Sequence, residues 1–538
     1  AAMLYPRFKQ PGINVAEEFE KRGVKFFTFA QLAHYLLISR PLKVKREDED
    51  RHRGLLKDAI LIIDEVHNIF KPLPHQKDEH FALRDFLLDY KNPWTKKLNI
   101  AILTATPGDR PEEIVDLLNL VRDRKKPKIV VPKGREGLQK FAADVKGLVS
   151  YFNISADLSK YPKVMRLAPH VGRMSMTQYR KYVEAFDGLE ADDTNWEKLV
   201  KEDRSERYYK PVRKYANMLY NIEKGMELEE FSAKLPLLIE QIRKYPNEKH
   251  YVYSSFFENR GYGGQGILAV ANVLEKELHY DKVDFALARK INDDKAPMLS
   301  SARKRYMLAT TGELTDKNYT IGENLKELMK FFNRAENKDG SVVHVFLASQ
   351  KFNEGVDFKA VRHIHILDPF LNYNKEVQTI GRGARYCSHR DLGMGDWNVK
   401  VHKYYADVPV EVTQLDIRKL KAHVEALKDA VRDEDKKVVA IKGLRGPEYK
   451  EIRDRAKAES ARLRGELSEI SKELKDAMAL DPEKYFMIDT KIEDEVLEKL
   501  RDQMTMLMIM KMVAVDCKLF REFHAQIGDE YECVERVD

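Results

Sequence analysis

The feature that most constrains the fold is a short aliphatic run, residues 59–63, that ends in two carboxylates. It reads Ala-Ile-Leu-Ile-Ile and is followed by Asp64, Glu65, Val66 and His67. An aliphatic run bounded by charge predicts a buried strand of a parallel sheet, and open α/β sheets place ligand chemistry at the carboxyl ends of such strands. Asp64 is therefore a candidate Mg²⁺ ligand, directly or through a water, and Glu65 could orient or deprotonate an attacking water. A strand end with solvated charges is the alternative.

A second strand-like run, residues 98–103, leads into Thr104, Ala105, Thr106 and Pro107. On its own this is only a strand that ends at a proline. It gains meaning because it follows the acidic strand after one helical segment. Its small hydroxyl side chains could then relay contacts between a nucleotide site and a neighbouring domain.

A third motif, residues 378–385, reads Gln-Thr-Ile-Gly-Arg-Gly-Ala-Arg and places Arg382 and Arg385 three residues apart. The two guanidiniums share one face if the segment is helical. Arginine is permanently charged and can bind phosphate oxygens bidentately. Arginines that stabilise charge on a transferring γ-phosphoryl group recur in nucleotide hydrolysis. The spacing therefore suggests a phosphate-handling role.

In this order, the three motifs resemble those of a superfamily-two helicase. Residues 64–67 are similar to motif II, residues 104–106 to motif III and residues 378–385 to motif VI. Between the last two, residues 352–358 read Phe-Asn-Glu-Gly-Val-Asp-Phe and are similar to motif V. The resemblance implies an α/β fold with two RecA-like domains that close over ATP, Mg²⁺ and a nucleic acid.

The resemblance also implies a role for each motif residue. The catalytic residues would be Asp64, which helps to hold Mg²⁺, Glu65, which positions water, and Arg382 and Arg385, which reach the γ-phosphate from the second domain. The nucleotide-binding residues would be Gly355, Asp357 and Gln378. The residues that couple hydrolysis to movement would be His67, Thr104 and Thr106.

Further segments are similar to a helicase group of nucleocytoplasmic large DNA viruses, which includes the poxvirus-type early transcription factor small subunit and nucleoside triphosphatase. They include residues 364–369, Ile-His-Ile-Leu-Asp-Pro, residues 147–152, Gly-Leu-Val-Ser-Tyr-Phe, and residues 514–517, Ala-Val-Asp-Cys. This resemblance implies DNA or RNA as a partner, with a viral RNA polymerase or another transcription subunit as a further one. It also implies an intracellular location, in the virion or in the host cytoplasm and its viral factory.

One expected part is absent, because the sequence contains no Gly-Lys dipeptide and hence no Gly-x-x-x-x-Gly-Lys-Ser/Thr phosphate loop. That loop holds the β- and γ-phosphates. The chain also opens without an initiator Met. We expect an N-terminal truncation that leaves this chain alone inactive. The alternatives are a scaffold that has lost ATP binding and binds nucleic acid or RNA polymerase, and a chain completed by a separate polypeptide.

Composition is compatible with these interpretations without proving them. The chain has 538 residues and a formal net charge of +7, too small an excess to demonstrate nucleic-acid binding. Its three cysteines show no metal-type spacing, which predicts ordinary thiols in a reducing compartment. The sequence shows no apolar stretch long enough to span a bilayer and no secretory leader.

Changes in pattern along the chain predict four regions. Residues 1–109 are the remainder of the first RecA-like domain, and residues 110–249 are a helical insertion. Residues 250–409 are the second RecA-like domain, and residues 410–538 are a helical C-terminal extension. Within the insertion, residues 204–214 mix basic and aromatic side chains that could contact nucleic acid, although a solvated helix face is the favoured interpretation.

Overall fold

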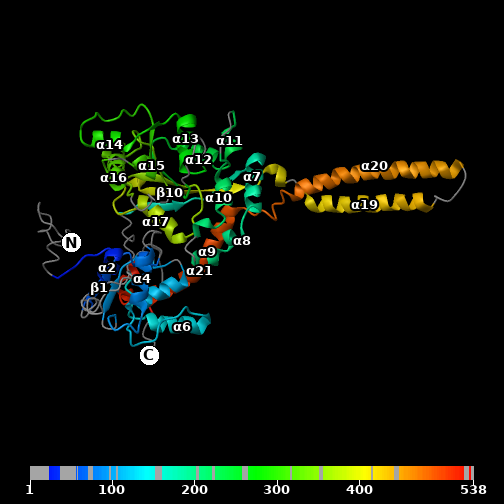
Figure 1. Cartoon of the computed structure of the whole chain (residues 1–538). Helices are drawn as coiled ribbons and strands as arrows, with labels where there is room; N and C mark the ends of the chain where they lie inside the picture. The colour runs from blue at the N-terminus through cyan, green and yellow to red at the C-terminus, as the bar shows by residue number, and fades with distance from the viewer. Residues whose placement is uncertain are drawn as a thin grey trace. The chain divides into compact units, whose positions relative to one another are not determined.

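The computed structural model divides into two compact units (Figure 1). Unit 1 comprises residues 1–156 and 498–538, and unit 2 comprises residues 157–497. The structure describes residues 23–36, 56, 59–70, 77–95, 98–104, 107–108, 110–151, 160–201, 205–220, 225–256, 265–315, 318–349, 356–413, 416–440, 447–525 and 532–534. The predicted division into four regions stays a prediction.

Unit 1 is built around two short parallel strands. Its strands are β1 (Ile60–Ile63) and β2 (Asn99–Ile102), and its helical elements include α2 (Phe29–Tyr35), η3 (Val66–Ile69), α4 (Lys77–Leu88), α5 (Pro111–Val121), α6 (Gly134–Val145) and α22 (Cys517–Ala525). The strands pair in register, with Ile63 opposite Ile102. The two strands that carry the motifs are therefore direct neighbours in the sheet.

The two faces of this small sheet differ in burial. On one face, Ile63 is 5% exposed and packs in a core with Leu83 and Leu117. On the other face, Ile60 is 70% exposed and Ile62 is 65% exposed. Parallel sheets are normally covered on both faces. Among the residues that the structure describes, the expectation of a fully buried strand is therefore wrong for β1, since Ile60 and Ile62 are exposed.

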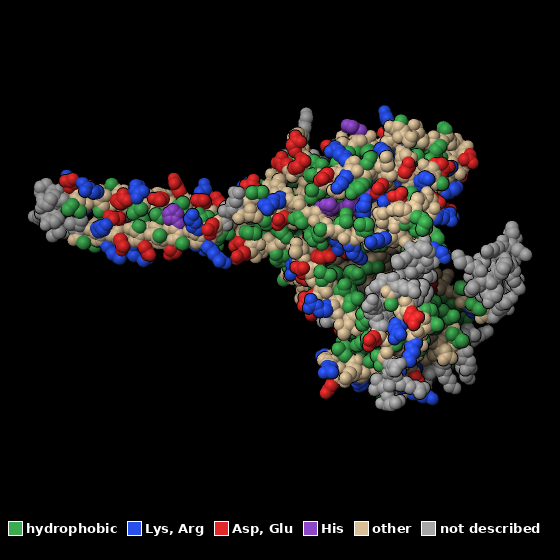
Figure 2. All heavy atoms as spheres, turned by 180° about the vertical axis from the view of Figure 1, so that it is seen from behind, with side chains coloured by type: hydrophobic (Ala, Val, Ile, Leu, Met, Phe, Trp, Pro, Cys, Tyr) green, Lys and Arg blue, Asp and Glu red, His purple; other side chains and the backbone are tan. Residues whose placement is uncertain are grey.

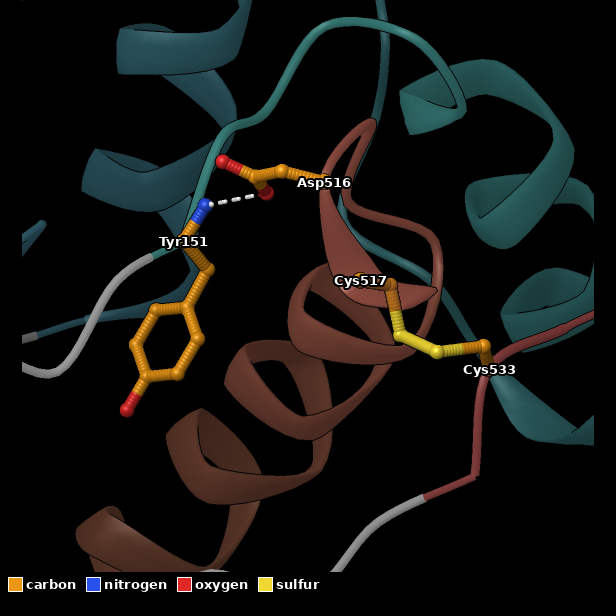
Figure 3. The surroundings of a disulfide bond; sticks show 4 residues. All are labelled: Tyr151, Asp516, Cys517 and Cys533. Carbon is orange, nitrogen blue, oxygen red and sulfur yellow. Dashed lines mark hydrogen bonds between the residues drawn. A yellow bond between two sulfur atoms is a disulfide. The ribbon is translucent and has the colours of Figure 1, made fainter. Parts of the chain in front are cut away.

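A disulfide bond joins Cys517, at the start of α22, to Cys533 (Figure 3). Beside it, Asp516 accepts hydrogen bonds from the Tyr151 backbone N–H at 3.0 Å and from the Ser150 hydroxyl. The prediction of three ordinary thiols is wrong for this pair. The two cysteines are 16 residues apart, so their proximity depends on tertiary packing that sequence spacing does not show.

Unit 2 contains a parallel sheet with the order β3-β10-β9-β5-β8-β7-β6, and β4 also pairs with β10. Its strands are β3 (Lys163–Arg166), β4 (His170–Arg173), β5 (Lys249–Ser254), β6 (Asp281–Lys282), β7 (Arg305–Ala309), β8 (Val345–Ser349), β9 (Val361–Ile366) and β10 (Asn398–Asp407). This confirms the expected α/β class with a parallel sheet.

Helices lie on both faces of the sheet, because alternate residues of each strand point to opposite sides. Tyr251 and Ile364 pack in one core with α14 (Phe285–Asn292) and α16 (Ile321–Phe332). Val252 and Leu347 pack in the other with α12 (Leu235–Lys244) and α13 (Ile267–Leu278). Other helical elements of unit 2 are α7 (Met176–Asp187), α8 (Ala191–Thr194), α9 (Trp196–Lys201), η6 (Ser205–Arg207), α10 (Lys210–Asn217), α11 (Leu228–Phe231), α15 (Thr311–Leu314), η7 (Ala335–Asn337), α17 (Tyr373–Gly383), η9 (Met394–Asp396) and α18 (Val410–Thr413).

A histidine cluster occupies part of the sheet and comprises His170, His250, His363, His365 and His402. The register places His250 beside His363 and His365 beside His402. Burial lowers the pKa of His363 to about 2 and that of His402 to about 3, and it lowers the pKa of His250 and of His365 well below the usual value. These four imidazoles are therefore neutral.

Two long helices, α19 (Ile417–Ala440) and α20 (Pro447–Met478), lie side by side as a hairpin (Figure 1). Acidic and basic side chains alternate over the hairpin surface in Figure 2. The hairpin lies within residues 410–538, the region for which a helical extension is predicted. A further long helix, α21 (Ile488–Met512), begins in unit 2 and continues into unit 1. Among the described residues, no helix is long and apolar enough to cross a membrane.

Two findings correct the expectation for residues 110–249. Strands β3 and β4 fall in this region, which was expected to be helical, because both find a pairing partner in β10 more than 200 residues later. Tyr208 and Tyr209 are buried, at 3% and 8% exposure, and the Tyr208 hydroxyl donates to Glu495 at 2.8 Å. These two aromatic rings are packed in the core rather than placed for stacking on bases.

Candidate functional site

In unit 1, the two candidate carboxylates lie in a tight turn directly after β1. Asp64 and Glu65 are both exposed, and Glu65 has a φ of 49°, in the left-handed region. The Asp64 Oδ1 atom accepts the Glu65 backbone N–H at 2.9 Å. A non-glycine residue in this conformation is uncommon and signals a local constraint. The turn thereby presents two consecutive carboxylates at the strand end.

His67, in η3, connects the two strand ends of unit 1. Its Nδ1 atom lies 3.0 Å from the Thr104 hydroxyl, just after β2, and 3.3 Å from the Glu65 carboxylate. Backbone hydrogen bonds support this geometry, since Leu103 donates to Ile63 at 2.9 Å. The structure therefore brings together the motif II and motif III residues, as the sequence order suggested. Thr106 lies outside the described residues.

The donor set at this strand end fits the implied Mg²⁺. Mg²⁺ prefers oxygen ligands, keeps several waters and is usually held by one or two carboxylates together with phosphates. Asp64 offers an exposed carboxylate next to that of Glu65, and an exposed position leaves room for waters. Asp64 would hold the ion, and Glu65 would lie on the side facing His67.

In unit 2, helix α17 carries the arginine motif and packs closely on the sheet. The Asn372 side chain caps its N-terminus by accepting the N–H groups of Asn374 and Lys375. Gly383, at its C-terminus, is in close contact with β9, because a Cβ atom there would lie 3.0 Å from the Ile364 Cδ1 atom. Glycine therefore permits the close approach that positions the end of the helix.

The two arginines of this motif do not share a helical face, which corrects the expectation from their spacing. Helix α17 ends at Gly383, so Arg382 is helical and Arg385 lies beyond the helix. Arg382 is half-buried, and its carbonyl accepts the Phe358 N–H at 3.0 Å. Arg385 is exposed, and its Nη1 atom lies 2.7 Å from Asp357 Oδ1 and 2.9 Å from Oδ2.

The structure thus joins motif VI to the end of motif V inside unit 2. Asp357 and Arg385 form the ion pair, and Arg382 binds the backbone of the residue after Asp357. Gln378 is half-buried within α17. Gly355 lies outside the described residues. The carboxylates Asp64 and Glu65 belong to unit 1 and the two arginines to unit 2.

A pocket beside Asp357 was not anticipated from the sequence. It is lined by Gly322, Lys326, Met329, Lys330, Asn333, Asp357 and Lys359. Lys326 and Lys330 lie one helical turn apart on α16 and are exposed. Their spacing of four residues on an amphipathic helix is a sequence signal, but it is also typical of any solvated helix face.

Comparison with known proteins finds similar sequences among viral helicases. Residues 292–387 match the family model of the helicase conserved C-terminal domain. The chain is 28% identical over 390 residues to a putative ATP-dependent RNA helicase (R563) of Acanthamoeba polyphaga mimivirus, which covers 66% of this chain and 61% of that protein. It is 24% identical over 472 residues to a termination factor NPH-I homolog of African swine fever virus, covering 75% of this chain and 62% of the relative.

A third relative and one solved structure extend the comparison. A putative helicase (087L) of Invertebrate iridescent virus 3 is 24% identical over 387 residues, with 66% of this chain and 35% of the relative covered. The chain thus spans between 35% and 62% of the length of these three relatives. The Sulfolobus solfataricus SWI2/SNF2 ATPase core, solved in complex with dsDNA, is 14% identical with a TM-score of 0.27 and covers 70% of this chain and 67% of its own. The sequence matches confirm the resemblance stated above: residues 292–387 are similar to the helicase conserved C-terminal domain, and the chain is similar to helicases of large DNA viruses.

Proposed function

We propose that this chain forms part of an ATP-dependent motor of the superfamily-two helicase type that acts on nucleic acid in viral transcription. The observation that supports this most directly is the position of His67. Its Nδ1 atom lies near both the Glu65 carboxylate and the Thr104 hydroxyl. One side chain thereby links the residue that would handle the attacking water to the neighbouring strand, as a coupled ATPase requires.

In the proposed ATP hydrolysis, side chains of this chain and the bound nucleotide have separate roles. ATP with Mg²⁺ would supply the γ-phosphoryl group and the charge that accompanies its transfer. Asp64 would bind the metal ion, and Glu65 would orient the attacking water. Arg382 and Arg385 would stabilise negative charge on the phosphoryl oxygens.

The exposed face of β1 supports the view that further polypeptide completes the nucleotide site. Ile60 and Ile62 present an apolar surface that a parallel sheet normally covers. We propose that the covering segment carries the phosphate loop, either from an N-terminal extension of this chain or from a separate polypeptide.

The lysine-lined pocket supports nucleic acid as the substrate. Lys326, Lys330 and Lys359 place three positive charges around one pocket, and phosphate contacts by lysine and arginine supply most of non-specific nucleic-acid affinity. The names of the relatives point the same way, since one is called an RNA helicase and another a termination factor homolog. Measuring ATP hydrolysis in the presence of DNA and of RNA distinguishes the two substrates.

The test uses this chain extended at its N-terminus by a segment that contains Gly-x-x-x-x-Gly-Lys-Ser/Thr. We expect hydrolysis of ATP that nucleic acid stimulates, and we expect Glu65→Gln to abolish turnover while nucleotide binding persists. Glu112→Gln, an exposed carboxylate in the first turn of α5, is the matched control and should hydrolyse normally. Unchanged turnover in Glu65→Gln would exclude the assignment.

The alternative is a scaffold that binds nucleic acid or RNA polymerase without hydrolysis. It is favoured by the lack of a Gly-Lys phosphate loop in the sequence. In that case the extended chain would bind nucleic acid with the same affinity whether or not ATP is present, and it would show no turnover.

A further inference from the structure

Three buried histidines lie close together on adjacent strands of unit 2. Among the described residues, His250, His363 and His365 each offer one imidazole nitrogen to a group whose ligand atoms all lie within 4.8 Å of one another. His250 is on β5, and the other two are on β9, which pairs directly with β5. All three are 0% exposed. The strand register therefore fixes the arrangement, since alternate residues of β9 share a face.

Two of the three imidazoles are anchored in the manner of metal ligands. The His250 Nε2 atom lies 3.1 Å from the Tyr245 carbonyl oxygen, and the His363 Nε2 atom lies 2.6 Å from the Glu248 carboxylate. A carbonyl and a carboxylate only accept, so each Nε2 must carry the proton. Each Nδ1 then presents its lone pair, which accepts a hydrogen bond from His365 Nε2 in the case of His250 and from His402 Nε2 in the case of His363. Metal-binding histidines almost always donate their other N–H to such an acceptor.

The third imidazole can change its tautomer without loss of a proton. His365 Nε2 lies 2.8 Å from His250 Nδ1, and His365 Nδ1 lies 2.8 Å from the Tyr404 hydroxyl. Because His250 Nδ1 is the acceptor, His365 donates from Nε2, and the Tyr404 hydroxyl donates to Nδ1. If a metal ion takes Nε2, the proton moves to Nδ1 and the Tyr404 hydroxyl rotates to accept it. The number of bound protons is unchanged.

From this geometry we propose that His250, His363 and His365 bind a Zn²⁺ ion within the sheet of unit 2. Neutral imidazole is a preferred ligand of zinc, and tetrahedral Zn–N bonds separate ligand atoms by about 3.3 Å, within the span of this group. The Glu248 carboxylate, bonded to His363, supplies negative charge beside the ion. His402 borders the group, and its Nε2 atom lies 3.0 Å from His363 Nδ1. The site does not depend on the proposed ATPase.

A metal ion can enter a fully buried site only while the sheet assembles. The experiment therefore supplies the metal during refolding. The full chain is unfolded in denaturant with EDTA, then refolded with Zn²⁺, with Co²⁺ or without metal. We expect one tightly held zinc ion per folded chain by mass spectrometry of metals. We also expect a visible absorption band of tetrahedral Co²⁺ and a higher melting temperature for the zinc-loaded chain.

Variants separate a ligand role from a packing role. His365→Gln should lose the zinc and the Co²⁺ band. Tyr404→Phe keeps the ring but removes the acceptor for the shifted proton, and it should weaken zinc affinity about 10–100-fold. His344→Gln is the control, because His344 is buried against His250 and bonds to the Tyr245 carbonyl, yet it is outside the group. It should keep the zinc.

Two results would overturn the proposal. One is a wild-type chain that refolds with the same melting temperature in Zn²⁺ and in EDTA and holds no stoichiometric metal. The other is a Tyr404→Phe or His365→Gln variant that folds and binds zinc as tightly as His344→Gln. Loss of ATP turnover would bear only on the proposed function.

Discussion

The Arg385 guanidinium is held by the Asp357 carboxylate, with Nη1 2.7 Å from Oδ1 and 2.9 Å from Oδ2. Both side chains are substantially exposed, at 46% for Arg385 and 65% for Asp357. Exposed ion pairs contribute roughly 0–1 kcal/mol to stability. The ion pair therefore contributes little to folding stability. We infer that its role is to orient the Arg385 guanidinium.

Arg385→Ala should reduce ATP turnover of the N-terminally extended chain on the order of a thousand-fold, because such arginines stabilise charge on the transferred phosphoryl group. Arg385→Lys should not restore turnover, since lysine lacks the planar fork. The melting temperature should stay unchanged. Arg390→Ala, an exposed arginine nearby in sequence, is the control for loss of positive charge.

His67→Ala should separate hydrolysis from its stimulation by nucleic acid. The variant removes the contacts from Nδ1 to Thr104 and Glu65, so basal turnover should persist while stimulation is lost. Thr104→Val should behave in the same way. The double variant should be no worse than either single one, because both remove the same contact. Additive losses would show that the two residues act separately.

Asp489→Ala should strongly destabilise unit 2. The Lys234 Nζ atom lies 2.6 Å from Asp489 Oδ2, and the two side chains are 0% and 1% exposed. Removal of one partner leaves an uncompensated buried charge, which costs about 3–5 kcal/mol. The double variant Lys234→Met with Asp489→Leu should regain most of the loss. Urea unfolding followed by circular dichroism measures both, and equal losses in the single and double variants would contradict this reasoning.

Reduction of the Cys517–Cys533 disulfide should destabilise unit 1. The bond closes a segment of 16 residues, and opening a loop of this size costs about 3 kcal/mol. Cys517→Ser should show the same lowered unfolding midpoint and should no longer respond to dithiothreitol. Cys387→Ser changes the free cysteine and should leave the midpoint unaffected. A wild-type midpoint insensitive to dithiothreitol would argue against a contribution from the bond.

Local sequence patterns predicted the features that depend on neighbouring residues. The aliphatic run before Asp64 and the run before Thr104 form paired parallel strands, and their ends meet through His67. The arginine motif begins on a helix, as its pattern allowed. These outcomes follow from hydrophobic runs and from the placement of charge at strand ends.

Features set by tertiary packing were missed because local sequence patterns do not show which distant residues come into contact. Helix α17 ends at Gly383, where the backbone lies close to Ile364, so the spacing of Arg382 and Arg385 alone gave the wrong geometry. The histidines of β5 and β9 are far apart in sequence and meet only through strand register. In Cys517–Cys533, two residues without a recognisable spacing are joined by the fold.

The pairing of β4 with β10 also affects the order in which the chain can fold during synthesis. His170 pairs beside Tyr404, so the partner strand is made 404 − 170 = 234 residues later. At about 5–20 residues per second, the ribosome needs roughly 12–47 seconds to reach it. During that interval β4 cannot form its edge pairing. This edge of the sheet must therefore be completed late in the synthesis of the chain.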